Sequence, residues 1–167
     1  MTSAIFHEHI FPHRHKLFRF ALRITGSRHE AEDVVQEVLE KVWKAPAEQS
    51  AGVQNWEAWC MTLTRNRSLD KTRSQTLRRT APLEGSVAQF SGSDNLHQSA
   101  ENRDLVDRVR QQMQLLPEKQ RLVMHLRDIE EMSYDEIAQT LQISLEQVKV
   151  NLHRARKSIR EHLLTEV

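Results

Sequence analysis

Positively charged side chains gather in two stretches of the sequence, one in each half of the chain. Residues 65–79 carry six Lys or Arg side chains against the single acid Asp70, and residues 147–160 carry five Lys or Arg and no acid. Clustered cations neutralise the phosphates of nucleic acids, and rings such as those of Trp56 and Trp59 offer faces on which unpaired bases stack. These residue types indicate nucleic-acid binding instead of catalysis.

Histidine pairs near the amino terminus raise the alternative of a metal enzyme. His7-x-His9 and His13-x-His15 are close in sequence, but catalytic zinc needs three convergent protein ligands. No pair of helix-spaced histidines is accompanied by a carboxylate base. We therefore predict surface histidines, with no catalytic residue, no bound metal and no cofactor.

The single cysteine, Cys60, excludes an internal disulfide and fits a reducing cytoplasm. We expect its side chain to be a small buried apolar group.

No apolar stretch approaches the length of a membrane span, and the amino terminus lacks the apolar core of a signal peptide. A cytoplasmic protein is therefore expected.

Helices must position the charged residues of the first half, because four Gly and four Pro are too few for the turns of a many-stranded protein. Helical spacing of apolar residues predicts a helix around 17–24 that stops at Gly26, a second over about 29–44 and a third over about 53–73. The second begins with the capping-box signature Ser27-x-x-Glu30. Opposite its apolar residues it carries a polar row: Asp33, Gln36, Glu37 and Glu40.

The second half predicts four more helices. The first covers about 104–116, and the next begins with Pro117 at its first position and runs to about 128. The signatures Ser133-x-x-Glu136 and Ser144-x-x-Gln147 predict two capped helices joined by a tight turn, which is a helix-turn-helix.

The last helix is the candidate DNA-reading element, because a basic stripe borders its apolar stripe. Its first turns suit the major groove, and the candidate base-reading positions are Glu146, Gln147, Lys149, Val150 and Asn151. Ser144 begins this segment, and side chains further along are candidate phosphate contacts: His153, Arg154, Arg156 and Lys157.

The chain therefore predicts an all-α protein of two small helical domains. Residues 1–80 carry a net charge of +4 and residues 81–104 a net charge of −3. The middle segment holds two of the four glycines and shows no helical spacing longer than a turn. We interpret residues 81–104 as a flexible linker and residues 105–167 as the second domain.

The two halves together resemble the sigma factors of bacterial RNA polymerase, in the two-domain extracytoplasmic-function (ECF) group of the sigma-70 family. The matching segments of the first half include Leu17-Phe-Arg-Phe-Ala-Leu-Arg-Ile-Thr-Gly26, Ala31-Glu-Asp-Val-Val-Gln-Glu37 and Trp59-Cys-Met-Thr-Leu-Thr-Arg-Asn66. Those of the second include Glu136-Ile137-Ala138 and Arg154-Ala155-Arg156. Both sets in this order cover nearly the whole chain apart from the linker.

The resemblance implies a subunit that binds core RNA polymerase and directs promoter-specific initiation without being an enzyme. It assigns the polar row Asp33, Gln36, Glu37 and Glu40 to the coiled coil of the β′ clamp. It assigns the third helix and the loop before it to the −10 element, whose non-template strand would be held by Asn55, Trp59, Arg65, Asn66, Arg67 and Arg73. Plain core packing is the alternative role for Trp56 and Trp59, and it is the expected one for Trp43.

The same resemblance implies that the second domain binds the −35 element and the polymerase β flap. Three positions depart from the family pattern. Gln142 stands where a glycine is common, and a left-handed backbone there would cost roughly 1 kcal/mol. Val150 replaces a small polar residue and Asn151 an arginine, so the preferred −35 bases cannot be inferred from relatives.

Members of the group are commonly held inactive by an anti-sigma factor, often membrane-bound, and one is expected here. The protein would then be cytoplasmic, and nucleoid-associated when active.

The alternative to a sigma factor is a stand-alone helix-turn-helix transcription regulator whose first half senses or dimerises. Capture of core polymerase by the chain would decide between the two.

Overall fold

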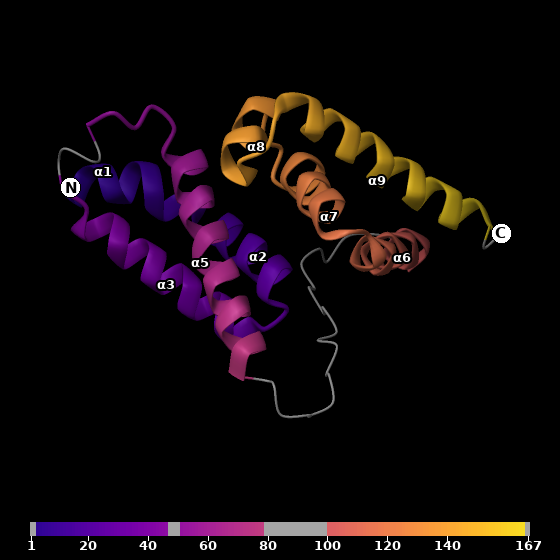
Figure 1. The fold of residues 1–167 in the computed structure, drawn as a ribbon, viewed down its shortest axis with the longest axis horizontal. Helices are drawn as coiled ribbons and strands as arrows, with labels where there is room; N and C mark the ends of the chain where they lie inside the picture. The colour runs from indigo at the N-terminus through magenta and orange to yellow at the C-terminus, as the bar shows by residue number, and fades with distance from the viewer. Residues whose placement is uncertain (1–2, 47–50, 79–99, 166–167) are drawn as a thin grey trace. The chain divides into compact units, whose positions relative to one another are not determined.

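The computed structural model describes residues 3–46, 51–78 and 100–165. Over these ranges every regular element is a helix (Figure 1), which confirms the predicted all-α class. The helices form two compact units, the first containing α1, α2, α3 and α5 and the second containing α6, α7 and α9. Of the described helices, none combines the length and the hydropathy that crossing a membrane requires.

Three long helices build the first unit, and short turns precede them. These turns are α1 (Ser3–Ile5), a π-helical turn (Phe6–Ile10) and a 3-10 turn (Phe11–His13), none of which the spacing analysis predicts. The long helices are α2 (Arg14–Thr25), α3 (Arg28–Lys44) and α5 (Trp56–Arg78). The sequence thus located all three, although α5 begins three residues later than predicted and runs five residues further.

Local chemistry explains where these helices begin and end. Gly26 ends α2 with φ of 68°, a left-handed conformation that glycine adopts at little cost, and its N–H donates to the Leu22 carbonyl. The Ser27 hydroxyl accepts from the Glu30 N–H at 3.4 Å at the start of α3. The Asn55 side-chain oxygen accepts from the Ala58 N–H at 2.9 Å, which caps α5 and fixes its start.

The core of the first unit lies between α2, α3 and α5, which cross one another in Figure 1. Leu17 and Phe20 of α2 are fully buried, as are Val34 of α3 and Met61 of α5. Burying side chains of this size stabilises a fold by about 1.5–3 kcal/mol each before the entropy of ordering them is subtracted. The opposite sides of α3 and α5 are consequently left for charged residues.

The described helices after residue 99 are α6 (Ala100–Leu115), α7 (Glu118–Met124), a π-helical turn (His125–Ile129), α8 (Tyr134–Leu141) and α9 (Leu145–Thr165). The helix predicted from Asp104 starts four residues earlier, at Ala100. Pro117 is the N-cap of α7 and not its first helical residue, with φ of −51° and ψ of 143°. Helix α9 packs against α7 and α6, and buries these side chains: Val148, Leu152, Ala155 and Ile159.

Both predicted capping boxes of the helix-turn-helix are present. The Ser133 and Glu136 side chains each bond the other residue's N–H, at 3.2 and 2.7 Å, and Ser144 and Gln147 repeat the pattern at 3.1 and 3.2 Å. Between them Gln142 has φ of 54°. The left-handed conformation expected at the usual glycine position therefore forms with a glutamine, at the steric cost stated above.

The separation into two domains is confirmed, but the predicted boundaries 1–80, 81–104 and 105–167 remain a prediction. Residues 79–99, which make up most of the predicted linker, lie outside the described residues.

Candidate functional site

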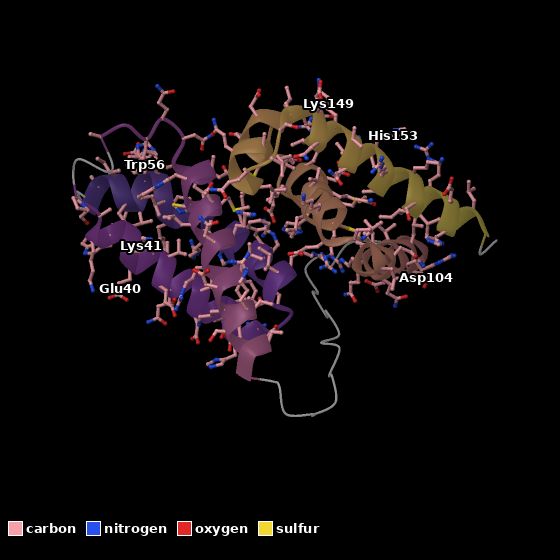
Figure 2. The ribbon with its side chains drawn as sticks, in the orientation of Figure 1. Glu40, Lys41, Trp56, Asp104, Lys149 and His153 are labelled. Atoms are coloured by element: carbon pink, nitrogen blue, oxygen red, sulfur yellow. The ribbon has the colours of Figure 1, made fainter. Side chains whose placement is uncertain are left out.

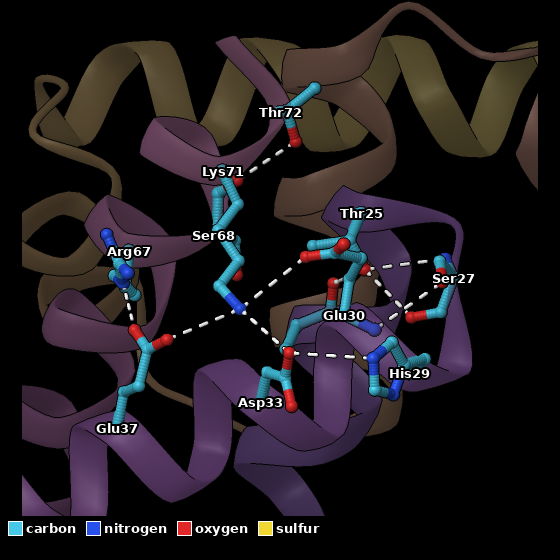
Figure 3. Close-up of polar contacts among 11 residues, drawn as sticks. Thr25, Ser27, His29, Glu30, Asp33, Glu37, Arg67, Ser68, Lys71 and Thr72 are labelled. Carbon is cyan, nitrogen blue, oxygen red and sulfur yellow. Dashed lines mark hydrogen bonds and ion pairs between the residues drawn. The ribbon is translucent and has the colours of Figure 1, made fainter. Parts of the chain in front are cut away.

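Lys71 of α5 lies among three carboxylates of α3 (Figure 3). Its Nζ is 3.2 Å from Asp33 Oδ2, 3.3 Å from Glu37 Oε1 and 3.5 Å from Glu30 Oε2. The Lys71 side chain is only 14% exposed. One partly buried cation thus joins the acidic side of α3 to the basic side of α5.

Arg67, one turn before Lys71, adds a second link by hydrogen-bonding to Glu37 (Figure 3). The hydrogen bond from Arg67 lowers the pKa of the Glu37 carboxyl, and Lys71 lowers it further against the opposing effect of burial. The same bond raises the pKa of Arg67. Burial disfavours the charge of Lys71, but its hydrogen bonds to Asp33 and Glu37 prevail and raise its pKa. The network therefore favours the charged forms of Glu37, Arg67 and Lys71.

The row predicted for polymerase divides into two parts. Asp33 and Glu37 belong to the network but keep 42% and 39% of their side chains exposed. Gln36 is exposed, and the exposed Glu40 pairs with Lys44 one turn further along α3. Figure 2 shows Glu40 and the neighbouring Lys41 on the outer side of α3. The structure thus brings the whole predicted row to one solvent-accessible side of the helix.

The residues predicted for the −10 element occupy different environments. Asn55 caps α5, so its side-chain oxygen is already bonded. Trp59 is half-buried against Trp56, with ring centroids 5.8 Å apart and planes at 71°. Arg65 donates to the Asn66 side-chain oxygen at 3.2 Å. Arg67 and Arg73 are exposed. Trp59, Asn66 and Arg73 share one side of α5, whereas Arg65 and Arg67 lie on nearly opposite sides of the helix and Arg67 bonds to Glu37 of α3.

The expectation that Trp43 lies in the core is wrong. Trp43 is 44% exposed, and its ring meets that of Phe6 in a T-shaped contact with a centroid distance of 5.1 Å. The turns before α2, which the sequence analysis did not find, supply this aromatic neighbour.

In α9 several predicted reading residues bond to their own helix. The amide oxygen of Gln147 accepts from the Ser144 N–H, and the Asn151 amide nitrogen donates to the Gln147 carbonyl at 2.7 Å. Glu146 and Lys149 are exposed, and they have no ion pair or hydrogen-bonded side chain within the described residues. Figure 2 shows Lys149 and His153 along this helix.

The cations further along α9 line an open groove of about 640 Å³ with Tyr134 and Leu152. His153 and Arg154 are exposed. Arg156 hydrogen-bonds to Asp128, which raises the pKa of the guanidinium, and Lys157 lies 3.7 Å from Glu161. Basic groups therefore dominate this side of α9, although two of them are already partnered.

The histidines and the cysteine have ordinary structural positions. Among the described residues, no group of three or more metal-binding side chains converges, and His13 lies 3.3 Å from Glu57. Cys60 is buried as predicted. Burial and the nearby Glu57 carboxylate raise the pKa of its thiol to about 12, so the reactive thiolate is scarce at neutral pH.

Comparison with known proteins accounts for both units. Residues 11–78 match the family model for sigma-70 region 2, and residues 107–159 match that for sigma-70 region 4. SigL of Mycobacterium tuberculosis, an ECF RNA polymerase sigma factor, is 33% identical over 150 residues, which cover 89% of this chain and 82% of SigL. The chain belongs to the ECF group of the sigma-70 family.

Other ECF sigma factors are similar over nearly the same part of the chain. SigE of Mycolicibacterium smegmatis is 30% identical over 152 residues, and the match spans 90% of this chain but 58% of SigE. SigW of Bacillus subtilis is 24% identical over 164 residues, spanning 90% of this chain and 84% of SigW. The matches therefore span little more than half of SigE but most of SigL and of SigW.

Solved structures show the same fold. The sigma factor RpoE of Bartonella quintana, in complex with the anti-sigma factor NepR, superposes with a TM-score of 0.68 at 23% identity, covering 97% of this chain and 98% of RpoE. CnrH, in complex with the cytosolic domain of CnrY, gives 0.65 at 20% identity, covering 99% and 92%. Sigma factors direct RNA polymerase to promoters and are not enzymes, so family membership confirms the predicted class and disfavours the stand-alone regulator.

Proposed function

We propose that this ECF sigma factor joins core RNA polymerase and directs promoter-specific initiation through three surfaces. The polymerase surface is the polar row of α3, the −10 surface is the set of cationic, polar and aromatic residues at the start of α5 and along it, and the −35 surface is the outer side of α9. The observation that carries the proposal is the adjacency of the first two within one unit, where Lys71 and Arg67 join α5 to α3.

The polymerase surface consists of Asp33, Gln36, Glu37 and Glu40, which would dock on the coiled coil of the β′ clamp. Its support is the position of these residues on the side of α3 that faces away from the buried Val34 and Val38. Glu40 and Gln36 are exposed and can meet a partner without disturbing the core.

The −10 surface consists of Asn55, Trp59, Arg65, Asn66, Arg67 and Arg73. Opening a duplex removes base stacking, which aromatic faces can replace at about 1–3 kcal/mol per base, and cations hold the freed strand by its phosphates. The half-buried pair Trp56 and Trp59 supports this role, because its rings combine a packed position with partial access to solvent.

The −35 surface lies on α9, whose first turns would enter the major groove of the duplex. Ser144, Glu146, Gln147, Lys149 and Asn151 lie in these turns, and His153, Arg154, Arg156 and Lys157 follow as phosphate contacts. The exposed cations of α9 support this assignment. In the same domain, residues outside α9 would contact the β flap.

The further partner of this proposal is an anti-sigma factor, of the kind that is often membrane-bound. NepR and CnrY are bound to RpoE and CnrH in the solved structures of the same fold. The protein would act in the cytoplasm and associate with the nucleoid when active. Its two domains, residues 1–80 and 105–167, would be joined by a linker over 81–104.

Capture of core RNA polymerase by the tagged full chain tests the polymerase surface. Glu40→Arg reverses an exposed charge of the row and should reduce the amount of core polymerase retained. Glu8→Arg makes the same change on an exposed residue of the same unit outside the row and should bind like the unmodified protein. Failure of the unmodified chain to retain polymerase, or equal retention by Glu40→Arg, would contradict the proposal.

A further inference from the structure

The capping box at the start of α9 limits which side chains can read bases there. The Ser144 hydroxyl accepts from the Gln147 N–H at 3.1 Å, and the Gln147 side-chain oxygen accepts from the Ser144 N–H at 3.2 Å. A glutamine that reads adenine uses its amide oxygen and nitrogen together. Gln147 would have to give up the cap to do so, and the loss of a capping bond destabilises a helix start.

Asn151 is restricted in a similar way. Its amide nitrogen donates to the Gln147 carbonyl at 2.7 Å, and its side chain is half-buried. The paired contact of an asparagine with adenine also requires both ends of the amide. Two amides that a sequence analysis would choose as base readers are therefore bound to their own helix.

Val150 lies between these residues with no such restriction. Its side chain is 45% exposed, whereas the neighbouring stripe residues Val148 and Leu152 are buried at 0% and 2%. One turn away along the helix, Glu146 and Arg154 are both exposed. Single exposed valines are common on protein surfaces, but this one stands among polar residues at the end of α9 that the proposed function places in the major groove.

The major groove offers one apolar feature to such a side chain. Each base edge presents hydrogen-bond donors or acceptors there, and thymine alone adds a 5-methyl group. We propose that Val150 packs against the 5-methyl group of a thymine in the −35 element and so determines the preferred base pair at one position. This inference rests on the proposed function of α9 as the −35 reader.

The test uses holoenzyme assembled from core RNA polymerase and the full chain. Selection from promoters randomised over the −35 element first gives the preferred duplex. Each thymine of that duplex, on either strand, is then replaced singly by deoxyuridine, which lacks only the 5-methyl group. At one thymine the replacement should weaken holoenzyme binding by about three- to fivefold, the size expected for burying one methyl group.

Variants then assign that effect to Val150. Val150→Ala should bind the thymine and deoxyuridine duplexes equally, and because the side chain is exposed the substitution leaves the core intact. Val150→Ile keeps a branched apolar group and should retain the discrimination. Lys157→Ala removes a phosphate contact and should weaken binding to both duplexes alike, with their ratio unchanged.

The outcomes separate this inference from the function on which it rests. A selected −35 element in which no thymine is sensitive to deoxyuridine would overturn the role of Val150 but leave promoter direction intact. Persistence of the discrimination in Val150→Ala would do the same. If the holoenzyme selects no −35 sequence at all, the proposed function of α9 itself is contradicted.

Discussion

Arg67 of α5 donates a hydrogen bond to the carboxylate of Glu37 on α3, so residues proposed for two different partners are bound to each other. Glu37 belongs to the polymerase row and Arg67 to the −10 surface. The two surfaces therefore meet along this pair. A partner that forms an ion pair with Arg67 or with Glu37 must therefore compete with the bond between these two residues.

Replacing Arg67 with alanine should impair promoter opening more than polymerase binding. The substitution removes a cation from the −10 surface but leaves Glu37 charged and still paired with Lys71. Strand opening is measured by permanganate reactivity of unpaired thymines, and polymerase binding by titration of labelled protein with core enzyme.

Arg28→Ala is the matched control for this experiment. Arg28 is an exposed arginine that also pairs with a carboxylate, that of Glu32, and it lies outside both surfaces. Its loss should change neither measurement. Equal losses of opening and polymerase binding in Arg67→Ala would show that the −10 surface is misassigned.

Lys71→Met should lower the free energy of unfolding of the protein by about 1–3 kcal/mol, within the usual range for a disrupted network. The change leaves Glu30, Asp33 and Glu37 together without the cation that joins them. Lys44→Met removes a 69% exposed lysine that pairs with Glu40 of the same helix, and should cost less than about 0.5 kcal/mol. Urea unfolding compares the two, and equal losses would mean that the network adds nothing beyond a surface pair.

The pairing of Glu37 with Arg67 should stabilise the protein in a pH-dependent way. The pKa of Glu37 is lowered from its ordinary 4.5 in the folded protein, so its contribution is complete above that value and is lost as the pH falls through the lowered pKa. Because both side chains are substantially exposed, the coupling should be at most about 1 kcal/mol.

A double-mutant cycle with Glu37→Gln and Arg67→Met isolates this coupling. The interaction free energy from urea unfolding should be present at neutral pH and disappear in strong acid. A coupling that stays constant over the acid range, or that grows as the pH falls, would contradict an ion pair.

Gln142→Gly should raise the free energy of unfolding by about 0.5–1 kcal/mol, because glycine adopts the observed φ of 54° without a side-chain clash. Gln139→Gly is the control. It places glycine at an exposed position inside α8 and should lower stability by about 1 kcal/mol. If both substitutions destabilise the protein equally, the conformation of Gln142 carries no strain.

The helices could be predicted because their determinants are local. Apolar spacing located α2, α3 and α9, and the Ser144 and Gln147 side chains formed the cap that their spacing indicated. The start of α5 was misplaced because the apolar pattern begins at Val53, whereas the capping group is Asn55. The short turns before α2 lack both a cap and a repeated apolar pattern.

The ion-pair network could not be predicted from spacing, because Lys71 and Asp33 are distant in sequence and meet only when α3 packs on α5. A partial signal exists in the sequence. Glu30, Asp33 and Glu37 fall on one side of a helix, and Arg67 and Lys71 are one turn apart on another. Complementary rows of this kind indicate a candidate pairing, but the register between two helices is set by their buried residues.

Run-off transcription tests the central claim most directly. Core RNA polymerase is incubated with a pool of promoter templates, with and without the full chain, and the starts of the transcripts are mapped. The account predicts transcripts from a specific set of promoters, sharing −10 and −35 sequences, only when the chain is present. Identical starts and yields with and without the chain would contradict it.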